Sequence, residues 1–207
     1  AQFDRRYLLQ LWTGDDAPGA VATPPPRGAS GGFFPNVHNA YVRVAINRRL
    51  GKVVAFRGKL PTAPATFHGD RRMGTGQVRY SSFCMNEAPA TTRVTDCAFD
   101  EQVPTNRKGI YTIVVSRSAD RPETARHSCG KAWIRWSKEG DGYRDPDFGW
   151  FQIRNMLPSR SFRHAIQLTS KPGDEKAVMG PYLPKLRYYA NAAAFARSAA
   201  GGCSSSR

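Results

Sequence analysis

The chain has 207 residues, of which 40% are hydrophobic and 11% aromatic, enough for one domain to bury a core without a metal or a partner. No apolar run approaches the roughly 18 residues that a membrane-spanning helix needs, which argues against a helical membrane span. The 31 Lys and Arg residues outnumber the 16 Asp and Glu residues and give a net charge of +15, which attracts polyanions.

The basic residues are scattered along the chain and never form a block of five. Scattered charge favours a surface that keeps the protein soluble over a dedicated polyanion site. The alternative is a partner: an anionic cell-surface polymer, an acidic polysaccharide, a protein or, less expected, nucleic acid. The sequence does not show whether the basic residues converge on one face.

Residues 1–35 are predicted to form an N-terminal arm. The first 13 residues carry enough apolar surface to dock on something, including Leu8, Leu9 and Trp12. Residues 14–35 are rich in Pro, Gly and Ala and indicate an extended connector that does not fold alone.

Residues 36–190 are predicted to form a β-sandwich. Val42, Val44 and Ile46 alternate with Arg43 and Ala45, the period of two that is typical of a half-buried strand. Similar runs recur, separated by Gly, Pro and Asn turns, which favours an all-β antiparallel sandwich, and the eight-strand version is a jelly roll. We predict strands at 42–46, 53–56, 78–85, 93–99, 110–116, 132–136, 150–154 and 162–169.

Residues 191–207 are predicted to form a tail with a short helix. The Ala-rich run at 190–200 has the highest helix propensity in the chain, and Gly201 and Gly202 end it.

Four cysteines allow three pairings: Cys84, Cys97, Cys129 and Cys203. Cys84 and Cys97 flank a short turn between two predicted strands, where a hairpin disulfide fits, and Cys129 with Cys203 would remain by elimination. The sequence does not decide the pairing, and four reduced thiols are the alternative. Because disulfides persist mainly outside the cytosol, we expect a secreted, periplasmic or cell-surface protein.

Seven strings stand out as motifs. They are residues 39–67 (NAYVRVAINRRLGKVVAFRGKLPTAPATF), 77–87 (QVRYSSFCMNE), 93–104 (RVTDCAFDEQVP), 109–122 (GIYTIVVSRSADRP), 129–133 (CGKAW), 154–167 (RNMLPSRSFRHAIQ) and 178–184 (VMGPYLP). Across residues 30–190 the chain resembles a family of uncharacterised bacterial exported proteins, related to the jelly-roll half of paired domains of unknown function.

This resemblance implies a β-sandwich, export and the cysteine framework of Cys84, Cys97 and Cys129. It implies no catalytic residue. Ser81 departs from the family pattern, which has a Trp after the Arg-Tyr pair, and this departure argues against an aromatic platform for sugars at that position.

Five residues are the candidate ligand site. Arg154 and Asn155 end a predicted strand, and with Arg79, Tyr80 and Asn86 they would line a polar concavity for carboxylate or hydroxyl oxygens. The alternative is that Asn155 only stabilises the local turn.

Two further chemistries find weaker support. Asp141, Asp145 and Asp147 supply oxygens that suit calcium, but their spacing matches no EF-hand and equally fits a hairpin turn, so we expect neither a metal nor a cofactor. A hydrolase or a metal-dependent jelly-roll enzyme would need His127, His164 and the acids around Cys97, among them Asp96 and Asp100, which we expect instead to form surface ion pairs with Arg79 or Arg93.

Three functions therefore remain. We favour a non-enzymatic exported module that binds a polymer or a protein, ahead of an enzyme of the types above. The third is a structural subunit of a secreted assembly, which the N-terminal arm suggests.

Overall fold

A computed structural model describes residues 38–71, 75–88, 93–169 and 174–203. The predicted N-terminal arm and its proposed role in an assembly fall outside these residues, so both stay predictions.

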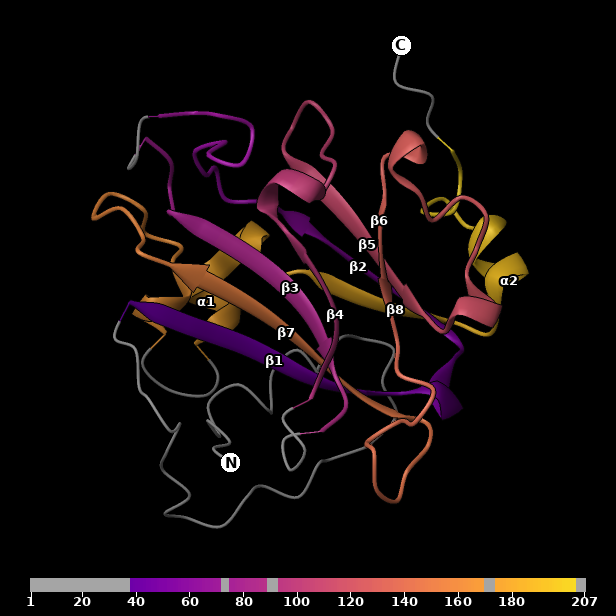
Figure 1. Ribbon diagram of the computed structural model, residues 1–207. Coiled ribbons are helices and arrows are strands. Elements are labelled where there is room, and N and C mark those ends of the chain that lie inside the picture. Colours follow the sequence, from indigo (N-terminus) through magenta and orange to yellow (C-terminus); the bar gives the residue numbers. More distant parts are fainter. Residues whose placement is uncertain (1–37, 72–74, 89–92, 170–173, 204–207) are drawn as a thin grey trace.

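Most of the regular secondary structure in the described chain is β-strand, arranged in two four-stranded sheets that face each other (Figure 1). The first sheet has the order β1-β7-β3-β4 and consists of β1 (Asn39–Asn47), β7 (Phe148–Met156), β3 (Tyr80–Asn86) and β4 (Val94–Phe99). The second sheet has the order β6-β5-β2-β8 and consists of β6 (Ala132–Arg135), β5 (Ile110–Ser116), β2 (Val53–Lys59) and β8 (Lys185–Tyr189). All neighbouring pairs are antiparallel except β5 and β6, which run parallel.

Helices are short and lie between or after strands. The α-helices are α1 (Glu175–Met179) and α2 (Ala192–Ala196), and α2 lies inside the predicted C-terminal tail. The 3-10 turns are η3 (Arg48–Leu50), η4 (Asp100–Gln102), η5 (Ser118–Asp120), η6 (His127–Cys129), η7 (Ile166–Leu168) and η8 (Gly180–Tyr182). Within the described ranges, no helix has both the length and the apolar character to cross a membrane.

The main core lies between the sheets and follows from the period of two along each strand. In β1 the inward residues are Val42, Val44 and Ile46, and Phe151 of β7 stacks on Phe56 of β2 across the core, with ring centroids 3.8 Å apart. The alternation thus leaves the other half of each strand's side chains on an outer face, which positions the candidate site described below.

The all-β prediction is confirmed, with two corrections to the strands. The predicted strand at 162–169 is wrong, because the amides of Phe162, Leu168 and Thr169 bond to carbonyls three residues back and form local turns instead of a ladder. The eighth strand is β8, which the prediction missed although Leu186 and Tyr188 alternate with Arg187. The parallel β5–β6 pair departs from a fully antiparallel sandwich, and the jelly-roll order stays a prediction.

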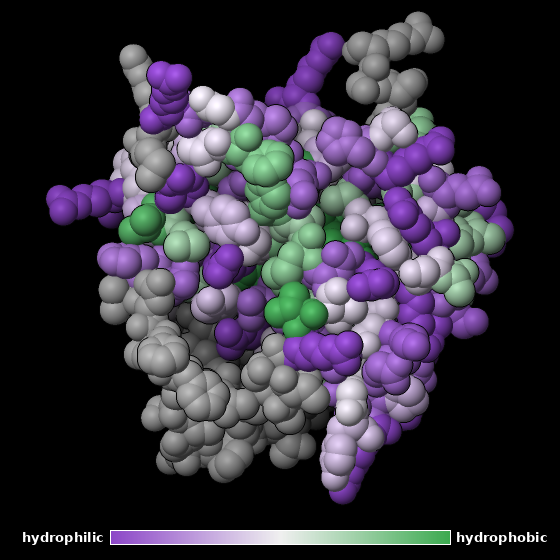
Figure 2. Space-filling view, viewed as in Figure 1, coloured by the Kyte–Doolittle hydropathy of each residue, from purple (hydrophilic) through white to green (hydrophobic). Residues whose placement is uncertain are grey.

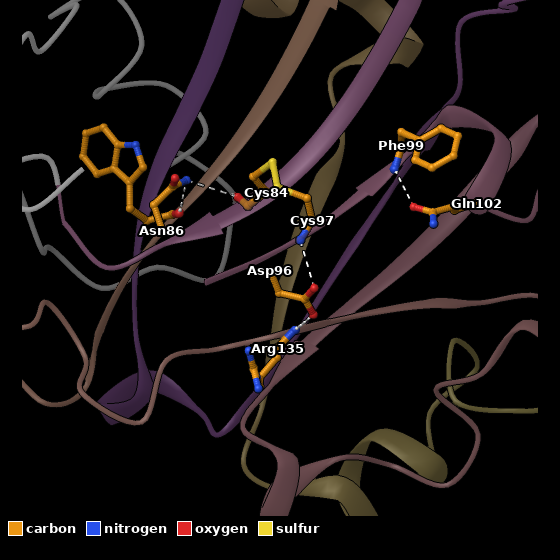
Figure 3. The surroundings of a disulfide bond; sticks show 8 residues. Cys84, Asn86, Asp96, Cys97, Phe99, Gln102 and Arg135 are labelled. Atoms are coloured by element: carbon orange, nitrogen blue, oxygen red, sulfur yellow. Dashed lines mark hydrogen bonds between the residues drawn. A yellow bond between two sulfur atoms is a disulfide. The ribbon is translucent and has the colours of Figure 1, made fainter. Parts of the chain in front are cut away.

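Both favoured cysteine pairs form disulfides. Cys84 and Cys97 are directly opposite each other on β3 and β4, and their sulfur atoms are bonded (Figure 3). Cys129 and Cys203 join positions 74 residues apart. No cysteine in the chain is free, so the alternative of four thiols is wrong, and the two disulfides indicate an oxidising compartment.

Candidate functional site

The outer face of the first sheet gathers arginine and aromatic side chains from four strands. Because the register is known, the outward residues can be placed in rows across the sheet. Arg154 of β7 lies opposite Tyr41 of β1 on one side and Ser82 of β3 on the other, and Ser82 lies opposite Phe99 of β4. We name this surface the arginine–tyrosine face; it consists of Tyr41, Arg43, Tyr80, Phe99, Gln152 and Arg154.

Stacking contacts hold these side chains in place. The guanidinium carbon of Arg154 lies 5.2 Å from the centroid of the Tyr80 ring, and Tyr80 stacks on Phe99 at 6.4 Å. In the neighbouring strand, Arg43 lies 4.7 Å from the Tyr41 ring and donates from Nε to Oε1 of Gln152 at 2.7 Å. A cation placed over an aromatic ring is attracted by the negative face of the ring, which favours this arrangement of the side chains.

Figure 2 views the molecule from this side. Apolar residues form a stripe in the middle of the view, over β3 and β4, and hydrophilic residues surround it. Val94 of β4 is 54% exposed and Phe67, which packs on Phe99 at 5.4 Å, is 73% exposed. The surface therefore combines apolar area with positive charge.

Arg154 has no ion-pair partner among the described residues. Its Nε atom is buried and has no hydrogen-bond partner in this part of the chain.

A buried carboxylate lies beneath one end of the face. Asp100, at the start of η4, accepts from the amide of Ser81 at 2.7 Å and from the amide of Glu101 at 2.9 Å. Burial raises the pKa of Asp100 above its ordinary value, although these hydrogen bonds and the nearby charge of Arg79 oppose the increase. Asp100 therefore organises the backbone under the face, and its oxygens are already engaged.

Two of the five predicted ligand residues meet here, since Arg154 covers the Tyr80 ring. A third, Arg79, directly precedes β3 and donates from Nη1 to Thr66 Oγ1 at 3.3 Å. The shared location follows from the β3–β7 register, which pairs Tyr80 with Met156 and Ser82 with Arg154.

The other two predicted residues lie elsewhere and are corrected. Asn155 has the opposite parity to Arg154, so it points into the sandwich, where it is 3% exposed and its Oδ1 accepts from Ser81 Oγ at 3.1 Å. Asn86 ends β3, about 20 Å along the strand from Tyr80 at 3.3 Å per residue. Its amide donates to the backbone oxygen of Trp150 at 3.3 Å (Figure 3). The side-chain amides of Asn155 and Asn86 therefore hold other parts of the first sheet in place.

The position of Ser81 differs from the one that the sequence suggested. It is fully buried and faces inward, so a larger side chain at that position would enter the core instead of extending an outer platform. The aromatic rings of the face come from Tyr80, Phe99 and Tyr41, so a serine at position 81 does not exclude a sugar platform on this face.

The acidic loop at 141–147 uses its oxygens within the protein. Asp141 Oδ1 accepts from the amides of Tyr143, Arg144 and Asp145 at 2.8–3.0 Å. The side chain of Asp145 accepts from Asn47 at 2.8 Å, and Asp147 pairs with Arg48 at 3.2 Å. In the described part of the chain, no three His, Cys, Asp or Glu residues are grouped so that they could hold a metal ion.

The residues named for an enzyme do not converge. Asp96 accepts from the amides of Cys97 and Arg135 (Figure 3), whereas Asp100 is buried beneath β3. His164 bonds through Nδ1 to the Val178 carbonyl at 2.7 Å, and His127 begins η6. Asp96 and Asp100 thus accept from backbone amides in place of the predicted surface ion pairs, while the buried carboxylate of Glu87 lies 3.3 Å from Arg93.

A pocket of about 290 Å³ lies beside the Glu87–Arg93 ion pair. Its walls include Glu87, Glu139, Arg93, Arg144 and Tyr143. Glu87 is 3% exposed and also accepts from Ser137 Oγ at 3.1 Å. Because two acids and two arginines line this pocket, their charges cancel, and it offers no selectivity for an anion.

Sequence reasoning missed Tyr41, Arg43, Phe99 and Gln152. Tyr41 and Arg43 were open to prediction, since they occupy the outward positions of the alternating run in β1. Phe99 and Gln152 join the face only through strand order and register, which no local signal contains.

Comparisons with known proteins add little. Neither a protein-family model nor a curated protein matches the chain. Among solved structures, the chain is similar to a crystal structure of an uncharacterised protein from Burkholderia cenocepacia, at 18% identity and a TM-score of 0.43 over 80% of this chain. The match spans 32% of the length of that protein. The resemblance to exported bacterial proteins therefore stays a prediction.

Proposed function

We propose that the protein is an exported, non-enzymatic module that binds an acidic polysaccharide on the arginine–tyrosine face. The observation that carries the proposal is Arg154, a guanidinium stacked on Tyr80 with no carboxylate partner in the described residues. A guanidinium offers a planar fork that fits a carboxylate with two parallel hydrogen bonds. An arginine in this setting is suited to a uronate group.

The aromatic rings favour a sugar as the backbone of the ligand. Tyr80, Phe99 and Tyr41 lie on one sheet face, and partly exposed rings can pack against the apolar faces of sugar rings. Gln152, fixed by Arg43, adds an amide that can bond to hydroxyl groups. The net charge of +15 would raise the encounter rate with any polyanion.

Export and the jelly-roll variety of the sandwich belong to the same proposal. Two disulfides support export, because they would be reduced in a glutathione-buffered cytosol. Two four-stranded sheets agree with a jelly roll in strand number, and the parallel β5–β6 pair would be a local variation.

The test is a binding titration with polygalacturonate, a neutral glucan and single-stranded DNA at low and moderate salt. We expect polygalacturonate to bind and Arg154→Ala to weaken its affinity about tenfold, since a charge-assisted hydrogen bond contributes about 1.5–3 kcal/mol and 1.4 kcal/mol is a factor of ten. Arg197→Ala is the matched control. It removes the same charge, and Arg197 is exposed at the end of α2 beside the second sheet.

Three results would overturn the proposal. The first is no retention of polygalacturonate at low salt, and the second is an equal loss of affinity in both arginine variants, which would indicate nonspecific charge attraction. The third is tighter binding of single-stranded DNA, whose bases also stack on aromatic rings, because it would make the face a nucleic-acid site.

A further inference from the structure

The loop between β2 and β3 presents an aromatic side chain beside the arginine–tyrosine face. The chain reverses at residues 65–70, where the amides of His68 and Asp70 both donate to the Ala65 carbonyl, at 3.1 and 3.0 Å. Phe67 lies at the tip of this reversal and is 73% exposed. Its ring packs edge-on against Phe99, with centroids 5.4 Å apart and an interplanar angle of 72°.

One carboxylate holds the tip of the loop. Glu101 of η4 accepts from the amide of Phe67 through Oε1 at 2.9 Å and from the amide of His68 through Oε2 at 3.1 Å. The same Oε2 lies 2.5 Å from Nδ1 of His68. The Glu101 side chain is 10% exposed although it is charged, so this carboxylate has exchanged water for three donors of a loop more than 30 residues earlier in the chain.

These bonds tie the loop to the face at two positions. Glu101 follows directly after Asp100, which anchors Ser81 of β3, and Phe99 precedes both at the end of β4. On the other side of the loop tip, Thr66 accepts from Arg79 at 3.3 Å. Phe67 therefore extends the stacked series Arg154, Tyr80 and Phe99 by one more ring.

We propose that Glu101 is a positioning residue that fixes Phe67 as the terminal aromatic wall of the ligand surface. This inference rests on the proposed function, since it assigns Phe67 to the same polysaccharide surface. Glu101 does not contact the ligand in this scheme. It would act by restricting the loop, so that an exposed phenylalanine is held in one place before a sugar ring packs on it.

The sign of the effect separates positioning from simple electrostatics. Glu101 is an acid on a basic protein, and removing its charge should by electrostatics alone strengthen the binding of an anionic polymer. If the carboxylate positions Phe67, its removal should instead weaken binding. Opposite directions are expected from the two causes.

The experiment compares Glu101→Gln with Glu123→Gln, which removes the same charge from an exposed residue that precedes η6. We expect Glu101→Gln to weaken polygalacturonate binding by about two- to fivefold, in the range of one aromatic contact. Phe67→Ala should weaken it by a similar factor, and adding Phe67→Ala to Glu101→Gln should cause no further loss. Glu123→Gln should leave the affinity unchanged or slightly tighter.

Amide exchange gives a readout that needs no ligand. The amides of Phe67 and His68 should exchange at least about tenfold faster in Glu101→Ala than in the original chain, while amides in the core strands β5 and β7 stay protected. Protection of the core also shows that the variant is folded. Unchanged exchange at Phe67 and His68 would overturn the inference.

The failures are distinguishable. If the original chain binds polygalacturonate and Glu101→Gln binds it as tightly as Glu123→Gln or tighter, the positioning role is wrong and the proposed function stands. If the original chain binds no acidic polysaccharide, the proposed function is wrong, and the ligand role of Phe67 is wrong with it.

Discussion

The outer faces of the two sheets differ in how much of their side-chain surface is exposed. On the second sheet, Val53, Ala55 and Val114 point outward and are fully or almost fully buried, because Phe195 of α2 and Ala125 pack over them. On the first sheet, Ala45 and Trp150 are also buried on the outer side, but the outward positions toward the other end of β7 and β3 carry Arg154 and Tyr80, both partly exposed. The chain after β8, which includes α2 (Figure 1), therefore completes the core on one side.

Each outer face carries one disulfide. Cys129–Cys203 fastens the C-terminal segment to the cover of the second sheet, and Lys131 reinforces it by donating to the carbonyls of Cys129 and Gly202 at 3.2 and 2.5 Å. Cys84–Cys97 lies in the first sheet and joins two strands that are already paired. Cys129–Cys203 therefore stabilises the segment that covers the second sheet, while Cys84–Cys97 stiffens the exposed face of the first sheet.

Removing the disulfides should therefore have unequal effects. Replacing both Cys129 and Cys203 by Ser should lower the free energy of unfolding by about 4.5 kcal/mol, because the closed loop is long, and replacing Cys84 and Cys97 by about 3 kcal/mol. Urea unfolding measures both. A larger loss from the Cys84 and Cys97 pair would contradict the assignment of the tail as the part that depends most on covalent fastening.

Two neighbouring residues of β7 sharpen the contrast between the inside and the outside of the first sheet. Asn155→Ala should lower the free energy of unfolding by about 1–3 kcal/mol, since it leaves the buried Ser81 hydroxyl without its acceptor, and should leave polygalacturonate affinity unchanged. Arg154→Ala should weaken polygalacturonate binding and leave the free energy of unfolding almost unchanged. Thermal unfolding and a binding titration on the two variants check the pair, and a loss of affinity in Asn155→Ala would return that residue to the site.

The smallest expected effect is the response of the loop at 65–70 to acid. Desolvation opposes the charged form of Glu101, but the hydrogen bonds from Phe67 and His68 outweigh it and lower its pKa below the ordinary value of 4.5. A carboxylate whose pKa is lowered by folding stabilises the fold above its unfolded pKa, and this contribution is lost as the pH falls through the folded value. Its neighbours are His68, which lies 2.5 Å from Oε2 and lowers the pKa of Glu101, and Asp100, whose negative charge opposes ionisation.

An NMR titration of the Phe67 and His68 amides checks this expectation. Their shifts should change together as the pH falls below 4.5, because the carboxylate that accepts from both amides is then protonated. In Glu101→Gln the step below 4.5 should be absent. A step that persists in this variant would assign the transition to another group.

Local patterns were sufficient for much of the fold. The alternation in β1 predicted both the strand and the outward direction of its arginine, and the spacing of Cys84 and Cys97 indicated a hairpin disulfide. Local reasoning failed at 162–169, where apolar residues at strand-like spacing fill two different clusters through turns. It also failed at Asn155, since proximity in sequence to Arg154 placed it on the wrong side of the strand.

The sequence by itself determined the strand-rich class, the cysteine inventory and the excess of positive charge, because each depends on residue type and on spacings of a few residues. Only the tertiary structure decided that Arg154 meets Tyr80 and that Glu101 holds Phe67. Those contacts depend on strand order, register and the direction of side chains across two sheets. A single-residue shift in any pairing would turn the same side chains to the opposite face.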